Sequence, residues 1–182
     1  MRNLFFIIIS LIFLSCNTDV LPKPKGYLGL TYPQKEYKIL TLKRPYTFDV
    51  LKRTTIIDDT NNWLKIKYPN LKASLDITYR PIENNLIELL TEAEKLVFKH
   101  AVKAEQITPK DFVNPKKRVF GSLYEITGNA ASNLQFHVTD STSNFIKGSL
   151  YFYAKPNYDS ILPAVAYIRE DVLKLIETLE WK

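Results

Sequence analysis

The fold of this chain is decided by residues 118–155, which read RVFGSLYEITGNAASNLQFHVTDSTSNFIKGSLYFYAK. Three apolar-rich segments are separated here by two short turn-like breaks, at 128–131 and 140–144. Alternating side chains between such breaks are typical of antiparallel strands, so the stretch predicts a three-stranded meander. Pairing Thr139 with Phe145 across the second turn sets the register of the last two strands.

Side-chain alternation in this register assigns residues to two faces of the meander. Val138 falls opposite Ile146 and Leu134 opposite Leu150, so one face is apolar. Extending the pairing across the first turn adds four residues of the first strand to this apolar face: Phe120, Ser122, Tyr124 and Ile126. The opposite face then carries eight side chains: Val119, Leu123, Asn133, Gln135, His137, Ser149, Tyr151 and Tyr153.

Part of this second face forms a candidate partner-binding face of four residues: Gln135, His137, Tyr151 and Tyr153. Such a cluster, aromatic and polar but low in charge, resembles the core of a protein interface. Two arrangements are open at this stage. A helix expected at 84–107 covers the face, or the face stays open and meets a partner. A concave version of the same face would instead bind a small ligand.

Further patterns complete an α+β fold, in which an antiparallel sheet (a hairpin plus the meander) packs with two main helices. Residues 37–42 and 46–50 read as strands, and residues 64–79 alternate about a turn at 69–70, which predicts the hairpin. Helical spacing runs over 84–107, with His100 on the buried side as a core histidine, and a loop with Pro109 and Pro115 follows. The last helix, 161–179, should cover the apolar face, with Asp171 on its outer side.

Composition and charge fit one globular body. The chain has 182 residues, 46% hydrophobic and 24% charged, which is enough for one well-buried core and too short for two. The net charge of +6 comes from small groups of Lys and Arg along the chain. This distribution is typical of a solvated surface, with attraction to an anionic membrane or an acidic partner as the alternative.

The N-terminus has the pattern of a bacterial lipoprotein signal peptide over residues 1–15. A positive start at Arg2 precedes an apolar run over 4–14, and Ser15 comes directly before Cys16. A helix of that run reaches only about 16 Å, too short for a permanent transmembrane span. We expect Cys16, the only cysteine, to be acylated and to become the first mature residue; a plain secretory peptide is the alternative.

The domain organisation follows from this signal. Residues 16–36 contain the lipidated cysteine and three prolines, and they are expected to form an extended tether. Tyr27 and Tyr32 are expected to dock part of the tether onto the body. Residues 37–182 are expected to form a single α+β domain.

The chain contains residue types that occur in catalytic sites, but the sequence does not place them in a catalytic arrangement. The sequence has no glycine-rich phosphate loop, no G-x-S-x-G elbow and no H-E-x-x-H motif. Ser132, His137 and Asp140 could supply a hydrolytic triad, but strand parity points Ser132 and His137 to opposite faces. Asp58 and Asp59 read as a solvated loop rather than a cation site. We therefore expect no catalytic residues, no metal and no cofactor. We also expect no nucleic-acid partner, because an exported, membrane-tethered chain would not ordinarily meet nucleic acid.

Short motifs are spread over nearly the whole chain: 20–24 (VLPKP), 45–48 (PYTF), 68–73 (YPNLKA), 78–81 (TYRP), 127–131 (TGNAA), 135–136 (QF), 138–142 (VTDST), 151–157 (YFYAKPN), 159–161 (DSI) and 177–182 (ETLEWK). Through these motifs the chain resembles the gliding-motility lipoprotein GldD family. The resemblance implies a lipid-anchored protein of the cell envelope, in the outer membrane and facing the periplasm, needed for gliding and the associated type IX secretion system. Its partners would be other gliding and type IX secretion envelope proteins, and the membrane through the lipid anchor.

One departure from the family concerns cysteines. Members of the family can carry cysteines just before the 45–48 motif and just before the hairpin, where this chain has Arg44 and Asn62. Any disulfide between those two loops is therefore missing here.

Three function classes remain after this reading. The favoured one is a non-catalytic envelope lipoprotein that assembles or stabilises partner proteins. The second is a periplasmic ligand-, lipid- or glycan-binding module, which requires a pocket lined by His137, Tyr151 and Tyr153. The third is a cryptic hydrolase, which requires a polarised nucleophile beside a base.

Overall fold

The computed structural model describes residues 32–153 and 157–182. The predicted signal peptide, Cys16 and the tether up to residue 31, Tyr27 included, lie outside the described residues.

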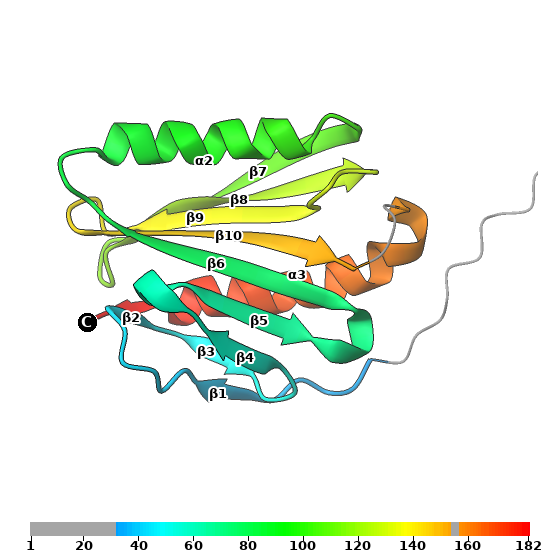
Figure 1. The fold of residues 1–182 in the computed structure, drawn as a ribbon, viewed down its shortest axis with the longest axis horizontal. Helices are drawn as coiled ribbons and strands as arrows, with labels where there is room; N and C mark the ends of the chain where they lie inside the picture. Colours follow the sequence, from blue (N-terminus) through cyan, green and yellow to red (C-terminus); the bar gives the residue numbers. More distant parts are fainter. Residues whose placement is uncertain (1–31, 154–156) are drawn as a thin grey trace, which may run out of the picture.

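The main element of the fold is a seven-stranded antiparallel sheet (Figure 1). Its strands, in spatial order, are β4 (Thr55–Asp58), β5 (Leu64–Tyr68), β6 (Ala73–Pro81), β10 (Asn144–Phe152), β9 (Leu134–Thr139), β8 (Val119–Gly128) and β7 (Ala104–Asn114). Two small antiparallel sheets pair β1 (Tyr37–Ile39) with β3 (Asp49–Leu51) and β2 (Tyr46–Thr47) with β11 (Glu180–Trp181). Within the described residues the helices are α2 (Leu86–His100) and α3 (Tyr158–Thr178), with short 3-10 turns η1 (Thr60–Asn62) and η2 (Pro69–Leu71).

The predicted α+β class and its two sheet components are confirmed. The β5–β6 hairpin and the β8–β9–β10 meander join through the antiparallel β6–β10 pair, which places Tyr79 opposite Ile146. Between β9 and β10 the register is the predicted one, with Thr139 opposite Phe145 and Val138 opposite Ile146. The hairpin turn is wider than a two-residue turn, because it consists of η2 and the following Lys72, whose backbone is in the left-handed region (φ 48°).

The predicted faces of β8 are wrong by one residue. The amide of Ile126 bonds the carbonyl of Asn133 (2.9 Å), which puts Leu123 opposite Phe136 and Tyr124 opposite Gln135. A one-residue shift exchanges the two faces of a strand. Val119 and Leu123 are therefore core residues beside Leu134 and Phe136. The four residues expected with them lie on the other face: Phe120, Ser122, Tyr124 and Ile126.

The loop between β8 and β9 explains this register. Asn133 donates its side-chain amide to the carbonyls of Ile126 (2.8 Å) and Gly128 (3.1 Å). Gly128 has φ +86°, which a residue with a side chain rarely adopts. These two features hold the loop in one shape, so the loop fixes the pairing rather than the apolar pattern of β8.

The helix predicted over 84–107 ends at His100, and Pro109, expected in a loop, lies in the edge strand β7. Pro115 does lie in a loop, the turn between β7 and β8. Ile107, counted as part of the helical stripe, pairs with Ile126 in the sheet. An isolated apolar residue fits both periodicities, so the pattern could not distinguish them. Pro109 is compatible with β7 because that strand has a neighbour on one side only.

Helices α2 and α3 cover opposite faces of the sheet (Figure 1). As predicted, α3 covers the apolar face, where Ile168 and Val172 are fully buried in the main core. On the other face, α2 makes two smaller clusters, Leu89 and Ala93 with Phe145, and Val97 with Ile126 and Ala130. Strand β9 is consequently buried on both sides along its whole length.

Candidate functional site

Of the predicted partner-binding face, only Tyr153 remains well exposed. Gln135 and His137 are 2% and 5% exposed beneath α2, and Tyr151 is half-buried, whereas Tyr153 is 57% exposed. An open four-residue face is therefore the wrong expectation for Gln135 and His137, because α2 supplies a second layer over them. They cannot line an open ligand pocket for the same reason.

The buried residues of this face contact other side chains of the same protein. His137 stacks on Phe145 with ring centroids 5.9 Å apart and contacts Tyr124 at the same distance. Ser149 donates to the side-chain carbonyl of Gln135 (3.5 Å). Burial lowers the pKa of His137, so the imidazole stays neutral at pH 7. His100, at the end of α2, is half-buried and packs edge-on against Tyr151.

The three residues that could supply a hydrolytic triad do not form one in the structure. Ser132 is buried and donates to the carbonyl of Leu134 (3.0 Å). Asp140 lies at the other end of β9, where one carboxylate oxygen accepts three backbone amides, from residues 142 to 144. Burial acts to raise the pKa of Asp140, but these backbone hydrogen bonds prevail and lower it to about 2. Asp140 therefore stabilises the β9–β10 turn.

A different cluster lies where the N-terminal segment meets α3. Tyr32 stacks on Tyr167 with ring centroids 4.5 Å apart. Lys35 reaches Asp171 (2.8 Å) and the carbonyl of Tyr167 (2.5 Å), and its ammonium lies 4.2 Å from the centre of the Tyr167 ring. Tyr37 donates to the same carboxylate (2.8 Å). We refer to these five residues as the tether clamp.

Asp171 is the central residue of the tether clamp. Its side chain is 5% exposed, and its neighbour Val172 belongs to the main core. Burial and the hydrogen bond to Asp171 raise the pKa of Tyr37, so its phenol remains a donor. A buried carboxylate is costly unless it is paired, and here Lys35 and Tyr37 provide the partners.

The sequence placed Asp171 on the outer side of the last helix, which is wrong. The sequence does contain a signal that Asp171 is buried. Asp171 follows Ile168 by three residues and directly precedes Val172, so it lies inside the apolar stripe of the helix. Of the two tyrosines expected to dock the tether, Tyr32 does so, and Tyr27 lies outside the described residues. The part of the predicted tether that the structure describes, residues 32–36, is thus in contact with the body.

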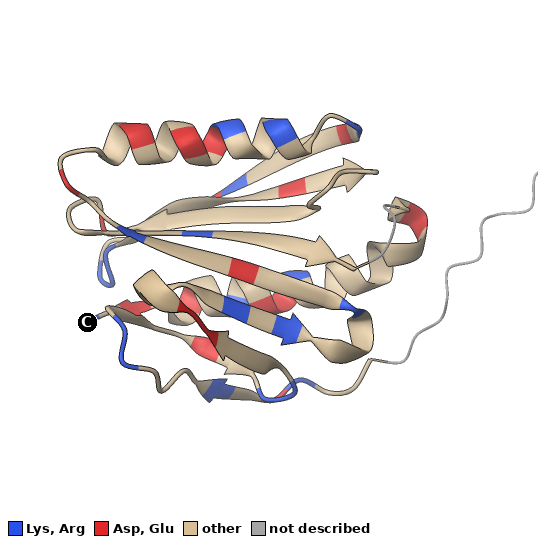
Figure 2. Ribbon diagram, in the orientation of Figure 1, with Lys and Arg blue, Asp and Glu red and all other residues tan. Residues whose placement is uncertain are grey.

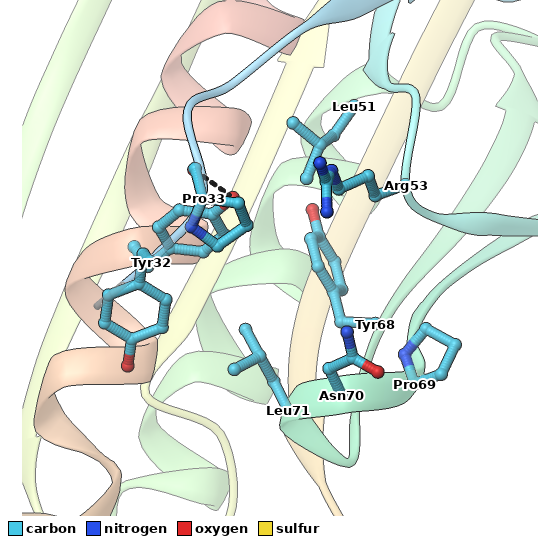
Figure 3. A pocket seen from close by; sticks show the side chains of 9 residues that line it. Tyr32, Pro33, Leu51, Arg53, Tyr68, Pro69, Asn70 and Leu71 are labelled. Carbon is cyan, nitrogen blue, oxygen red and sulfur yellow. Dashed lines mark hydrogen bonds between the residues drawn. The ribbon is translucent and has the colours of Figure 1, made fainter. Parts of the chain in front are cut away.

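Beside the tether clamp is a small pocket of about 60 Å³ (Figure 3). It is lined by Tyr32, Pro33, Leu51, Arg53, Tyr68, Pro69, Asn70, Leu71 and Tyr167. Its walls are mostly aromatic and apolar, and Arg53 is the one charged residue among the described residues that line it. Pockets for small organic ligands usually measure about 300 Å³ or more, so this one is too small to enclose such a molecule.

A third cluster surrounds Arg44, at one of the two positions where the family resemblance implies a cysteine. The guanidinium is buried, forms an ion pair with Asp58 and donates to the carbonyl of Trp63 (2.6 Å). Tyr46 donates to the carbonyl of Asn62 (2.6 Å). The two loops that a disulfide would join are therefore in contact here through hydrogen bonds.

Across the described residues, we find no helix with the length and apolar character needed to cross a bilayer. The fold and the tether clamp together define a class: an α+β protein in which residues 32–37 are docked on the C-terminal helix α3. The family model described as gliding motility lipoprotein GldD matches residues 17–181. The chain therefore belongs to the gliding motility lipoprotein GldD family, which confirms the resemblance drawn from the motifs. No curated protein sequence matches it significantly.

Membership places the chain in a family of lipid-anchored proteins of the cell envelope that are involved in gliding motility. The family is not a known enzyme family.

Proposed function

We propose that this protein is a non-catalytic part of the gliding apparatus that assembles or stabilises partner proteins. Those partners are other envelope proteins of gliding and of the associated type IX secretion machinery. Cys16 carries the lipid, and the protein sits on the outer membrane and faces the periplasm. It needs neither a cofactor nor nucleic acid for this role.

The tether clamp is the observation that carries the proposal. Lys35 and Tyr37 fix the tether to Asp171, which is buried against the core. A lipid anchor on a freely hinged tether would leave the body free to rotate, whereas a docked tether restricts the surfaces that partners can reach. A body held in a fixed orientation relative to its anchor suits a protein that stabilises its partners.

The interactions of the three residues that could have supplied a hydrolytic triad support the same role. Ser132 and Asp140 bond backbone groups, and His137 is packed between two aromatic rings beneath α2. None of the three has the geometry of a nucleophile beside its base.

The test uses a gliding bacterium in which the gene is deleted. If the protein stabilises its partners, the deletion lowers the amounts of other gliding and type IX secretion proteins in the envelope while their messenger RNA levels stay the same. The wild-type gene restores both protein amounts and gliding. Ser132→Ala and His137→Gln, expressed at wild-type level, restore them too.

Two results would contradict the proposal. Unchanged partner amounts and unchanged complexes in the deletion strain would exclude a stabilising role. Loss of gliding in Ser132→Ala or His137→Gln, with normal folding and abundance, would indicate chemistry at those residues.

A further inference from the structure

One end of the body carries both the tether and the β5–β6 turn. Tyr32 of the tether and residues 69–71 of the turn line the same small pocket (Figure 3). The end of β10 lies beside them, because Phe152 pairs with Ala73 and the amide of Tyr153 bonds the carbonyl of Lys72 (2.8 Å). We refer to Arg53, residues 69–72 and Tyr153 as the tether-end surface.

The charge of this surface is positive. Arg53 and Lys72 are exposed, and neither forms an ion pair with any carboxylate among the described residues. The neighbouring Lys52 is paired with Glu36 (3.0 Å). Figure 2 shows basic residues along this part of the molecule. Two unpaired cations thus flank the pocket and the turn.

The same surface carries amphipathic and apolar groups. Tyr153 is 57% exposed, Pro69 is exposed at the tip of the turn, and Leu71 is partly exposed beside it. Tyrosine, with an apolar ring and a polar hydroxyl, is enriched where protein meets the headgroup layer of a membrane. Lysine and arginine there add attraction to anionic lipids.

The tether limits how far this surface can lie from the membrane. Cys16 and Tyr32 are 16 positions apart in the sequence. A fully extended chain of that length spans roughly 55 Å, and a flexible one has a typical end-to-end distance of about 20–25 Å. Because the tether clamp attaches the chain next to the pocket, the tether-end surface is the part of the body held nearest to the anchor.

We infer that the tether-end surface rests on the anionic phospholipid headgroups of the membrane that holds the lipid anchor. The inference rests on the proposed acylation of Cys16. Arg53 and Lys72 attract the headgroup phosphates, and Tyr153 with the tip of the turn enters the headgroup layer. The tether supplies a high local concentration, so weak contacts at this surface are enough to orient the body.

The experiment uses the full-length lipidated protein in vesicles of phosphatidylcholine, alone or mixed with phosphatidylglycerol. An environment-sensitive fluorophore is attached through Asn70→Cys, which offers a single free thiol because Cys16 is acylated. The matched probe is Lys116→Cys, in the β7–β8 turn at the opposite end of the sheet. The probe at 70 is expected to shift to the blue and to be quenched by brominated lipid, in the anionic vesicles only, and salt weakens both effects.

Charge reversal tests the residues. Arg53→Glu with Lys72→Glu is expected to lower the lipid-contacting fraction about tenfold or more, since each basic group near an anionic surface contributes appreciably. The matched control, Lys95→Glu with Lys116→Glu, makes the same change in net charge away from the surface and leaves the signal unchanged.

Vesicle flotation separates this inference from the anchoring on which it depends. If the protein floats but the probe at 70 behaves like the probe at 116, the membrane contact is wrong and the anchoring stands. If the protein does not float, anchoring fails and the inference fails with it. A probe at 70 that is shielded in native envelopes but water-exposed on vesicles would identify a protein partner instead and overturn the lipid contact.

Discussion

The ammonium of Lys35 lies 2.8 Å from a carboxylate oxygen of Asp171, a residue 136 positions later on the inner side of α3. This pair joins the N-terminal tether to the C-terminal helix. Both side chains are shielded, at 19% and 5% exposed, so the interaction is screened less than a surface ion pair.

The first prediction concerns this pair. Asp171→Asn removes the charge that Lys35 neutralises, and Lys35→Met leaves the buried carboxylate with less compensation. Each is expected to lower the free energy of unfolding by about 2 kcal/mol. The double variant should lose much less than the sum, because the two side chains act as a pair. Urea unfolding of the full chain measures all three.

The control for the tether clamp is Lys38→Met, since Lys38 is exposed and forms no ion pair among the described residues. Its effect should stay within about 0.5 kcal/mol. Additive losses in the Lys35–Asp171 cycle would show that the pair does not act as a unit.

The second prediction concerns Arg44. Arg44→Met keeps the length of the side chain but deprives the carbonyl of Trp63 and the hydroxyl of Tyr46 of a buried donor. A loss of about 2–3 kcal/mol in unfolding free energy is expected. Lys43→Met, at the exposed neighbouring position, should change little. A loss no larger than that of Lys43→Met would exclude Arg44 as the link between the two loops.

The third prediction concerns pH. Burial lowers the pKa of His137 from its usual 6.5, so below that value the unfolded chain binds more protons than the folded one. Stability is therefore fully present above pH 6.5 and decreases as pH falls toward the folded pKa. The free energy of unfolding is therefore expected to be lower at pH 5 than at pH 7.

His137→Gln should flatten this pH dependence, because it removes the titrating group while keeping a polar side chain. His100→Gln is the comparison, and a smaller effect is expected since His100 is only half-buried. Urea unfolding at a series of pH values gives the curves. If the curve of His137→Gln runs parallel to that of the wild type, another group causes the loss.

The fourth prediction concerns the core beneath α3. Gly148 lies directly opposite Phe136, and a Cβ atom at position 148 would overlap the Phe136 ring. Gly148→Ala is therefore expected to cost about 1–3 kcal/mol through overpacking. Adding Phe136→Leu should recover part of that loss, although Phe136→Leu alone destabilises. Melting temperatures of the three variants would reveal whether the two positions share one space.

The fifth prediction concerns the anchor. Cys16 is the only cysteine, so Cys16→Ser removes the only site that a lipoprotein signal can acylate. The variant should fold normally but appear in the soluble fraction, or stay unprocessed at its signal peptide. Fractionation with metabolic labelling by a fatty acid measures both outcomes. Undiminished labelling or membrane attachment of a processed variant would place the lipid elsewhere.

Local patterns were sufficient for much of the fold. Short polar turns predicted the β5–β6 hairpin and the β9–β10 register, where the Asp140 carboxylate accepts three nearby amides. Helical spacing predicted α3 and its burial against the meander. These features depend on residues close in sequence, so alternation and turn chemistry determine them. The motifs likewise identified the family before the fold was known.

Other features depended on the loops between elements. The face of β8 is set by the bonds that Asn133 makes across its loop, and the end of α2 is set by the start of β7. A pattern of apolar residues fits either register, or either element, until such a connection is formed. Whether Gln135 and His137 are covered was equally undetermined, because α2 could have packed on either face.

The sequence by itself determined the β5–β6 hairpin, the β9–β10 register, the last helix, the signal pattern at Cys16 and the family. Only the tertiary structure decided that Asp171 points toward the tether and that Lys35 and Tyr37 meet it there. Tyr37 and Asp171 are 134 positions apart, and no local rule relates residues at that separation. The carboxylate is stable in its buried place only when folding brings those distant donors to it, which is why its position could not be read from the helix alone.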